Sequence, residues 1–410
     1  MIRKLAEILA LRRNVVVLLA MLVLVMMGER MFERYLPKYL EELGASASQI
    51  GILGFLQNGL GAIYALFGGF VTDRFGHKRS LFLFALLNLL GYALLLVPHW
   101  GVVLAATFFY MGWSQLSLPA TFSLVAEQLP QHKRVMGLAV QAVVRRIPMA
   151  VGPVLGGAIL TYYGTVQGMP YVVGLAALLT LVAVWMNLRL STAERSSAQY
   201  ERLDLRGLWK TFRPQLKRLL ISDILIRFCE QIPYTFVSLW VLDVVARSNF
   251  ELGLLTAVEM TTAASLYIPV ALWVDAKVRK AAVSDRESTV LQTERKPFVL
   301  ATFVFFTAFP ALLYFSRSLW WLVLAFVVRG LKEFGEPSRK ALIADLAAPG
   351  VKARTVGLYY FIRDLTVSLA ALMGGALWGV SPGLNLWVAF AFGVAGTLFY
   401  ALTTPDSAEK

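Results

Sequence analysis

Residues 68–80, GGFVTDRFGHKRS, bring Asp73, Arg74, His77, Lys78 and Arg79 together within seven positions. Long apolar segments lie on both sides of this polar stretch. A loop of a soluble protein has such a composition, and so has the turn between two membrane helices. The rest of the chain decides between the two.

The composition favours a membrane protein. The chain has 410 residues, of which 58% are hydrophobic and 16% charged, and its mean hydropathy is +0.65. Soluble domains carry about 25% charged residues. The basic start, MIRKLAEILALRRN, leads into an apolar run without a small-residue cleavage site, so we expect no cleavable signal peptide. The single cysteine, Cys229, excludes an intramolecular disulfide, and we expect no metal site.

A spanning helix needs about 20 mostly apolar residues, and about twelve segments meet this rule. We therefore predict an all-α membrane protein with an N-terminal six-helix bundle at residues 1–188 and a C-terminal one at 216–410. Residues 189–215 are predicted to be a cytoplasmic linker that includes a short amphipathic helix. We interpret the polar insert 277–296 as a disordered linker, with a regulatory contact as the alternative. The segments centre near Val25, Ile63, Leu87, Trp113, Ile147, Leu178, Cys229, Thr261, Phe305, Glu333, Leu365 and Phe392.

The Lys and Arg residues are distributed unevenly between the two sides of this topology. With a cytoplasmic N-terminus, 28 of the 39 fall on the cytoplasmic side, Arg339 among them, and eight lie inside segments. Only Lys38, Arg247 and Arg317 fall on the opposite side. This bias predicts cytoplasmic termini, most simply in a bacterial inner membrane. It also explains the net charge of +14 without a nucleic-acid partner.

The two halves of the chain resemble each other. Span one contains RMFE (30–33) and span seven contains RFCE (227–230). Further matches pair residues of spans four and five with residues of spans ten and eleven: Gly112 with Gly330, Pro119 with Pro337, Glu127 with Asp345, Gly137 with Gly357, and Arg145 with Arg363. Parallel six-helix repeats are typical of transporters whose binding site lies near the midplane between the halves.

Many charged residues lie inside the predicted spans, where each costs at least about 2.5 kcal/mol. They are Glu29, Arg30, Glu33, Arg34, Arg145, Arg146, Asp223, Arg227, Glu230, Glu259, Arg329, Lys332, Glu333, Glu336, Arg363 and Asp364. The four on span ten follow helical spacing and are predicted to share one face. Mutual ion pairing would explain some of these residues. A water-filled central cavity explains the whole set better, because apolar packing is often as stable as buried pairs.

The signs of these charges indicate the substrate. Arginine forks suit carboxylates and phosphates, so we expect a polar, anionic or zwitterionic organic molecule. The candidate binding residues are Arg30, Arg34, Arg145, Arg146, Arg227, Arg329, Lys332, Glu336, Arg363 and Asp364, with Trp113 and Tyr359 as flat apolar surfaces. The alternative interpretation is that these two aromatic side chains pack between helices and do not contact the substrate.

Two motifs resemble those of the major facilitator superfamily. Gly69, Asp73, Arg74, Gly76 and Arg79 match its loop signature between helices two and three. The resemblance implies that Asp73 docks at the start of helix eleven and helps to close the cytoplasmic side. The second-half counterpart keeps Asp275 but lacks the glycines. Glu127 and Asp345 are further candidates for gating.

The second motif, GPVLGG, contains Gly152, Pro153 and Gly156 and is similar to an element of the drug:proton antiporter branch. Small residues let membrane helices pack closely. One departure is that Met111 stands opposite Arg329 in the repeat, where span four of the family often carries arginine.

The resemblance implies a secondary active exporter that works by proton antiport and alternating access, acts as a monomer among membrane lipids, and needs no cofactor besides protons. The candidate proton carriers are Glu33 and Glu230, then Glu29 and Glu333. Alternatives are a proton-coupled uptake symporter, a lysolipid or lipid exporter, and a non-transporting sensor. We expect no enzyme, because the sequence has no nucleotide loop or nucleophile elbow, and His77, His99 and His132 are predicted to lie in loops.

Overall fold

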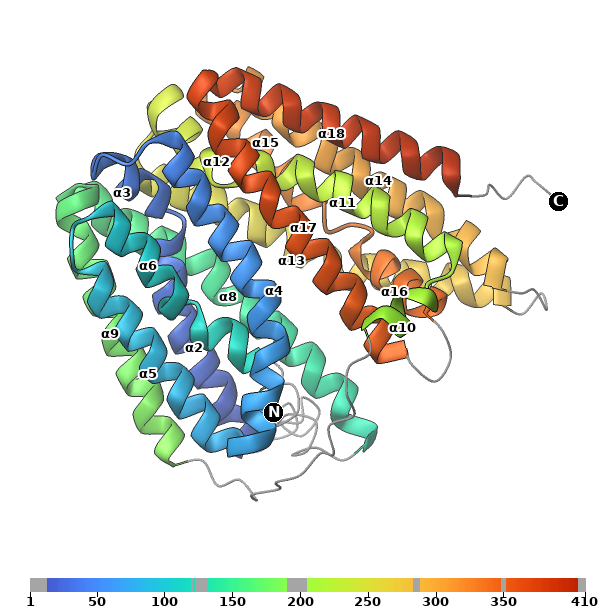
Figure 1. Cartoon of the computed structure of the whole chain (residues 1–410), viewed down its shortest axis with the longest axis horizontal. Helices are drawn as coiled ribbons and strands as arrows, with labels where there is room; N and C mark the ends of the chain where they lie inside the picture. The colour runs from blue at the N-terminus through green and yellow to red at the C-terminus, as the bar shows by residue number, and fades with distance from the viewer. Residues whose placement is uncertain are drawn as a thin grey trace. The chain divides into compact units, whose positions relative to one another are not determined.

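The computed structural model describes residues 13–118, 121, 131–189, 205–282, 288–347 and 352–404, and these contain helices and no strand. The all-α prediction is therefore confirmed for the described residues (Figure 1). The chain divides into two compact units. Unit 1 comprises Met1–Ser46, Leu56–Tyr200 and Val241–Ala257, and unit 2 comprises Ala47–Phe55, Glu201–Trp240 and Val258–Lys410.

The helices of unit 1 surround α2, which is buried along most of its length. Its helices are α2 (Arg13–Glu33), α3 (Leu36–Glu42), most of α4 (Ala47–Phe75), α5 (His77–Leu95), α6 (Trp100–Tyr110), α8 (Gln131–Tyr163) and α9 (Thr165–Leu188). The α2 helix packs against α8 and α9, and α5 packs against α6 and α9. Its buried face includes Leu18, Leu22 and Val25, which join side chains of α5 and α9 in one apolar cluster.

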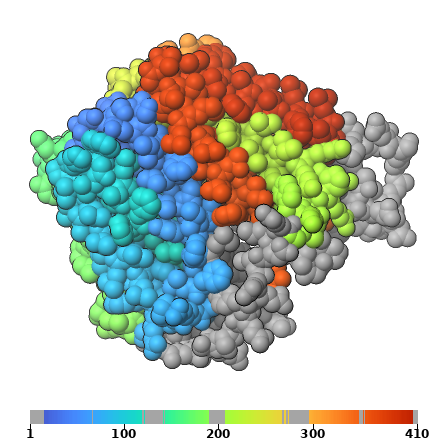
Figure 2. Space-filling model, viewed as in Figure 1, coloured from blue at the N-terminus to red at the C-terminus, as the bar shows by residue number. Residues whose placement is uncertain are grey.

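Unit 2 is built around α11. Its helices are α10 (Leu205–Lys210), α11 (Pro214–Tyr234), α12 (Phe236–Leu239), most of α13 (Asn249–Ala282), α14 (Ser288–Phe315), α15 (Leu319–Leu331), α16 (Glu336–Leu346), α17 (Lys352–Val380) and α18 (Pro382–Thr403). A short π-helical turn, Trp240–Val244, follows α12. The α11 helix contacts α14, α17 and α18, and the side chains of α11, α17 and α18 adjoin on one face of unit 2 (Figure 2).

Eight helical segments in the described residues are long and apolar enough to cross a membrane, and a ninth is possible if α4, bent by 42° between Ala65 and Phe67, counts as one span. The predicted segments around α11, α13 and the α15–α16 pair do not qualify. Large apolar side chains on the outer helix faces are exposed, among them Leu178, Trp185 and Leu402. Apolar surface of this extent marks the region that contacts lipid.

The predicted tenth span is not one continuous helix. The α15 helix ends at Leu331 and α16 begins at Glu336, so the prediction that positions 329, 332, 333 and 336 share one helical face is wrong. Gly330 and Gly335 have weak helical propensity, and Pro337 cannot donate a backbone hydrogen bond. The amide of Gly335, which is freed by the break, donates to Thr302 Oγ1 at 2.6 Å.

The predicted fourth span breaks in a similar way at Met111, which ends α6. Helical turns resume at 112–118, and the amide of Trp113 donates to Asn88 Oδ1 at 2.7 Å. Side chains of the neighbouring helices α5 and α14 thus satisfy an amide at each break, as buried backbone groups require. The break at Met111 adjoins Gly112 and the break after Leu331 adjoins Gly330, and the internal repeat pairs these two glycines.

Two loop predictions need correction. The insert 277–296 is mostly helical, because α13 continues to Ala282 and α14 begins at Ser288. This stretch contains no glycine or proline before its end, and its Ala, Lys, Arg and Leu residues favour helix. Two of the three histidines do not lie in loops either: His77 and His132 lie in the first turns of α5 and α8. His99 lies in the loop before α6, as predicted, and its side chain caps that helix.

Candidate functional site

The central helix of unit 2, α11, carries three charged residues on one face. Asp223, Arg227 and Glu230 follow one another at intervals of four and three residues, which places them on the same side of a helix. Asp223 is fully buried. It accepts hydrogen bonds from the Tyr359 hydroxyl at 3.1 Å and from Arg363 Nη1 at 3.3 Å, and it forms an ion pair with Arg339.

Arg339 connects α11 to α16. Its side chain is 1% exposed, and its guanidinium donates to Glu336 from Nε at 2.9 Å and from Nη2 at 2.7 Å, besides its ion pair with Asp223. The prediction that Arg339 is one of the cytoplasmic loop cations is therefore wrong. Arg339 is the fourth residue of α16, and the apolar run of α15, on which the predicted span rested, ends eight residues before it.

A second group of charges follows along α11. Arg227 donates to Glu230 at 2.6 Å, and Lys332 Nζ lies 2.8 Å from Glu230 and 3.2 Å from Glu259. Arg329 Nε pairs with Glu259 at 3.1 Å. The two groups join where Arg227 Nη2 lies 3.9 Å from Glu336. The result is one chain of ion pairs from Arg363 to Arg329, which we call the charged network.

The break between α15 and α16 places the ends of two helices at this network. Arg329 and Lys332 lie at the C-terminal end of α15, where the helix dipole favours cations. Glu336 is the first residue of α16, where the dipole favours anions. The helix dipoles therefore stabilise the charged forms of these three side chains independently of their ion pairs.

Aromatic rings border the network on the side of α14. Phe305, Phe306 and Phe309 line a small cavity together with Glu230, Arg329 and Lys332, and this cavity of about 10 Å³ has room for roughly one water molecule. The Arg329 guanidinium lies 4.8 Å from the ring centre of Phe309. The Lys332 ammonium and the Arg227 guanidinium lie 5.8 and 5.2 Å from that of Phe306. These are cation–π distances.

Unit 1 holds a buried carboxylate of a different kind. Glu29 on α2 is 3% exposed and accepts a hydrogen bond from the neutral Asn88 Nδ2 at 2.7 Å. Within the described part of the chain Glu29 forms no ion pair. Asn88 thus contacts both the carboxylate and the break before Trp113. Glu33 differs, because it pairs with Arg30 at 2.5 Å and is partly exposed.

Arg145 lies in the same unit, on α8. It interacts electrostatically with Glu29, Arg30 and Arg146, and it forms no ion pair with any residue that the structure describes. Arg34 and Arg146 are partly exposed. Unit 1 therefore combines more cations than carboxylates at this level, whereas the cations of the charged network all face carboxylates.

The GPVLGG element lies at a crossing of three segments. A Cβ atom on Gly156 would lie 1.8 Å from the carbonyl oxygen of Met31, and one on Gly152 would lie 2.7 Å from Arg30 Cβ, so only glycine permits this approach of α8 to α2. On another side, the Tyr35 hydroxyl donates to Pro153 O at 2.5 Å and lies 3.0 Å from Asn249 O.

Near Tyr35, a pocket of about 390 Å³ opens between α3, α9 and the segment 242–249. Lys38 and Arg247 line it, and Lys38 pairs with Asp243 and, at 2.7 Å, with Glu41. Partial burial lowers the pKa of Lys38, but hydrogen bonds to Asp243 and Glu41 outweigh this effect and raise it above its usual value. Burial raises the pKa of Glu41, against the effect of Lys38.

The residues of the loop signature lie at the junction of α4 and α5. Gly76 has a φ of 78°, a conformation that favours glycine, and Asp73, Arg74 and Arg79 are exposed. The docking of Asp73 on helix eleven stays a prediction. Glu127 lies outside the described residues, and Asp345 pairs with Arg295.

The structure brings together seven of the proposed site residues in the charged network: Arg227, Glu230, Arg329, Lys332, Glu336, Tyr359 and Arg363. Asp364 pairs with Arg363 at its edge, at 2.7 Å. Glu333 is partly buried in the α15–α16 break, and Trp113 is fully buried, with its amide on Asn88, the partner of Glu29. Sequence reasoning identified the charges of Asp223 and Glu259 but assigned them no role, and it missed Asn88 and Arg339.

In the described residues no group of three or more His, Cys, Asp or Glu side chains is arranged to hold a metal ion. In the charged network, each carboxylate has at least one cation as its partner. Its arrangement suits reversible exchange of charged partners within a buried site.

Comparison with known proteins adds independent information. The family model described as Major Facilitator Superfamily matches residues 18–284. A protein of Photorhabdus laumondii subsp. laumondii named Multidrug resistance protein MdtH is 24% identical over 377 residues, 89% of this chain and 87% of the relative. The MdtH protein of Yersinia enterocolitica is 23% identical over 375 residues, 88% of this chain and 86% of the relative.

Solved structures of low sequence identity share the fold. The nucleoside transporter NupG superposes with a TM-score of 0.75 at 14% identity and covers 95% of this chain and 99% of its own. A POT family transporter in complex with 5-aminolevulinic acid reaches 0.74 at 13% identity, with 96% of both chains covered. The human organic anion transporter MFSD10 reaches 0.62 at 16% identity, with 95% and 99% covered.

Proposed function

Because the chain belongs to the major facilitator superfamily and is therefore a membrane transporter, we propose that it exports a small zwitterionic organic molecule by proton antiport. The cavity next to Glu230 is the observation that supports this most strongly. One carboxylate, two cations and three phenylalanine rings line the same small space. A multidrug transporter name among the relatives agrees with export.

The residues around this cavity explain the choice of a zwitterion. An ammonium group of the substrate would bind Glu230 and lie against the rings of Phe306 and Phe309. A carboxylate or phosphate of the same molecule would accept hydrogen bonds from Arg329 and Lys332. The cavity has room for about one water molecule, so the substrate enters only after these side chains have moved apart.

Coupling to protons follows from the same carboxylate. A proton on Glu230 removes the charge that binds the ammonium, so proton and substrate exclude each other, which is the condition for antiport. Lys332 keeps Glu259 as a partner at 3.2 Å when Glu230 is protonated or occupied. Glu259 thereby keeps Lys332 paired while Glu230 changes partners, and Glu336, at 3.9 Å, remains as a partner for Arg227.

A second candidate function rests on unit 1. Glu29 accepts its hydrogen bond from the neutral Asn88, and Arg145 has no ion pair in the described residues. Protonation of Glu29 removes a negative charge near Arg145 and so strengthens the attraction of Arg145 for an anion. Here proton and substrate assist each other, which is the condition for symport, so this arrangement favours proton-coupled uptake of an organic anion.

The pH dependence of substrate binding separates the two candidates. The probes are an aromatic amino acid, its N-acetyl derivative and its methyl ester, which differ only in the presence of the ammonium and carboxylate charges. Purified protein is screened by thermal shift, because a ligand of the folded state raises the unfolding temperature. For the antiporter we expect a shift with the zwitterion alone that grows as the pH rises. A shift with the N-acetyl anion that grows as the pH falls supports the symporter instead.

Flux measurements then test Glu230 directly. In proteoliposomes with an imposed pH gradient, Glu230→Gln should abolish proton-driven accumulation, while the exposed Glu42→Gln control should retain it. Unchanged coupling in Glu230→Gln removes this residue as the proton carrier. Loss in Glu29→Gln with retention in Glu230→Gln transfers the role to unit 1.

The topology completes the proposal. We assign twelve membrane crossings in two six-helix bundles, residues 1–188 and 216–410, with both termini in the cytoplasm of a bacterium. The charged α11, α13 and α15–α16 segments account for crossings that apolarity alone does not identify. Alternating access between the bundles would expose the charged network to each side in turn, and the protein would work as a monomer.

A further inference from the structure

A basic surface surrounds the short helix α10 and the start of α11. It consists of Trp209, Lys210, Arg213, Lys217 and Arg218. Lys217 is partly exposed and the other four are exposed. The sequence from Leu205 to Ser222 contains five Lys or Arg residues and no carboxylate. A positive surface of this density attracts anions.

The cations of the basic surface differ from those of the charged network. No ion pair joins a carboxylate of the described residues to any of the four cations of the basic surface, which are Lys210, Arg213, Lys217 and Arg218. Arg218 makes a long contact, from Nη1 to the carbonyl oxygen of Thr403 at 3.5 Å. Their charges are therefore available to a ligand that brings its own negative charge.

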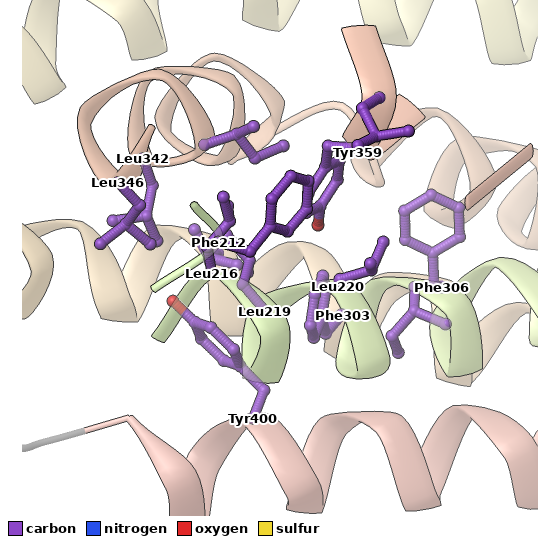
Figure 3. Close-up of a cluster of buried hydrophobic side chains, with 14 of the residues drawn as sticks. Phe212, Leu216, Leu219, Leu220, Phe303, Phe306, Leu342, Leu346, Tyr359 and Tyr400 are labelled. Atoms are coloured by element: carbon purple, nitrogen blue, oxygen red, sulfur yellow. The ribbon is translucent and has the colours of Figure 1, made fainter. Parts of the chain in front are cut away.

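The scaffold beneath this surface is well packed. Leu208 and Phe212 are 9% and 3% exposed and belong to the main apolar cluster of unit 2, with Leu216, Leu219 and Tyr359. Figure 3 shows Phe212 next to Leu216 in this cluster. The α10 helix also packs against α17. Residues 208 and 212 hold one side of the segment in the core, so Trp209, Lys210 and Arg213 point outward from a fixed base.

Trp209 gives this surface an amphipathic element. Its ring centre lies 5.0 Å from that of Phe212, and the Lys217 ammonium lies 5.1 Å from it. Tryptophan is enriched at the level of lipid headgroups, because its ring is apolar while its N–H is polar. A cation over such a ring places a positive charge at the same depth.

We propose that the basic surface binds the headgroup of an anionic phospholipid at the membrane surface. The phosphate oxygens accept hydrogen bonds from Lys210, Arg213 and Lys217, and the Trp209 ring lies at the depth of the glycerol backbone. The distribution of Lys and Arg along the chain assigns this surface to the cytoplasmic leaflet. The inference rests on membrane insertion and is independent of the transported substrate.

The test uses the full chain, purified in a neutral detergent and mixed with increasing mole fractions of phosphatidylglycerol or phosphatidylcholine. The unfolding temperature is measured at each fraction. The variant Lys210→Gln/Arg213→Gln/Lys217→Gln removes three charges from the surface. The control Lys277→Gln/Arg279→Gln/Lys280→Gln removes three charges from the same predicted side of the membrane. The wild type and Trp209→Leu complete the set of four proteins. All four are measured at the same detergent-to-protein ratio.

The wild type should be stabilised by phosphatidylglycerol and not by phosphatidylcholine. The surface variant should need a phosphatidylglycerol fraction about 100-fold higher for half of the effect, since each cation near an anionic surface contributes a factor of about five. The control variant should respond like the wild type, and Trp209→Leu should lose less of the stabilisation by phosphatidylglycerol than the surface variant. The stabilisation of the wild type and of the control variant by phosphatidylglycerol should fall at high salt.

Two outcomes would overturn the proposal. An equal loss in the control variant would show a general charge effect without a defined site. An equal stabilisation of the wild type by inorganic phosphate would show a site for free anions instead of lipid. Native mass spectrometry of the same samples checks the conclusion, because the surface variant should retain fewer phosphatidylglycerol molecules than the control.

Discussion

Replacement of Arg339 by leucine tests whether the charged network is a unit. Arg339 is 1% exposed and binds Asp223 and Glu336 at the same time. The next residue, Lys340, is 52% exposed and lies 3.6 Å from the same Glu336. Arg339→Leu and Lys340→Leu therefore remove one positive charge each from adjacent positions of α16 and from one shared partner.

The expected magnitudes differ because the two sites differ in burial. Removal of one partner of a buried ion pair costs about 3–5 kcal/mol, because the remaining charge stays in a medium of low dielectric constant. Removal of one partner of an exposed pair costs about 0–1 kcal/mol. Arg363 at 3.3 Å from Asp223 and Arg227 at 3.9 Å from Glu336 remain after Arg339→Leu. They place the expected loss near the lower end, at about 3 kcal/mol.

The free energy of unfolding is measured by titration of detergent-solubilised protein with sodium dodecyl sulfate and followed by tryptophan fluorescence. We expect Arg339→Leu to be less stable than Lys340→Leu by about 2 kcal/mol or more. Addition of Glu336→Gln to Arg339→Leu should restore about 1 kcal/mol, because a neutral amide costs less to bury than a carboxylate whose remaining partners, Lys340 and Arg227, lie 3.6 and 3.9 Å away. Equal stabilities of the two single variants, or no recovery in the double variant, would refute this reasoning.

Three further predictions concern other parts of the chain. Asn88→Leu should lower the free energy of unfolding by about 1–3 kcal/mol, because it leaves the buried Trp113 amide and Glu29 without their partner; Thr180→Val, at another buried polar residue of unit 1, is the comparison. Gly156→Ala should prevent folding and insertion, because its Cβ would lie 1.8 Å from Met31 O. Gly174→Ala, with open space around the Cβ position, should instead raise the free energy of unfolding by about 0.5–1 kcal/mol. Similar expression levels of the two variants would contradict the packing argument. Because burial raises the pKa of Glu41 above its usual 4.5, the stability that this carboxyl contributes is present below pH 4.5 and is lost as the pH rises through the folded-state pKa, so Glu41→Gln should flatten this part of a profile of unfolding midpoint against pH.

The helical class and most of the helix positions follow from the sequence because they depend on apolar length, which is a local property. The charged positions of α11 were also evident, since Asp223, Arg227 and Glu230 stand out in an apolar run. The internal repeat placed Gly112 opposite Gly330, close to the two helix breaks. These features need no knowledge of which helices are neighbours.

Partnerships between helices were not predictable in the same way. Arg339 lies in a polar stretch, and only the packing of α16 on α11 shows that it is buried next to Asp223. Asn88 is an ordinary residue in sequence, and its role depends on the break of a neighbouring helix at Met111. The insert 277–296 was interpreted as a linker because of its charges, while its lack of glycine and proline was the better signal for the helical residues 277–282 and 288–296.

The ion pairs of unit 2 also restrict how its helices move. They tie α11 to α13, α15, α16 and α17 through contacts that have few alternatives away from water. A tilt of one of these helices alone would separate opposite charges, whereas a tilt of all five together would break none of these bonds. Spin labels on α11 and α17 should therefore keep a constant separation through the transport cycle, because these five helices move as one rigid body.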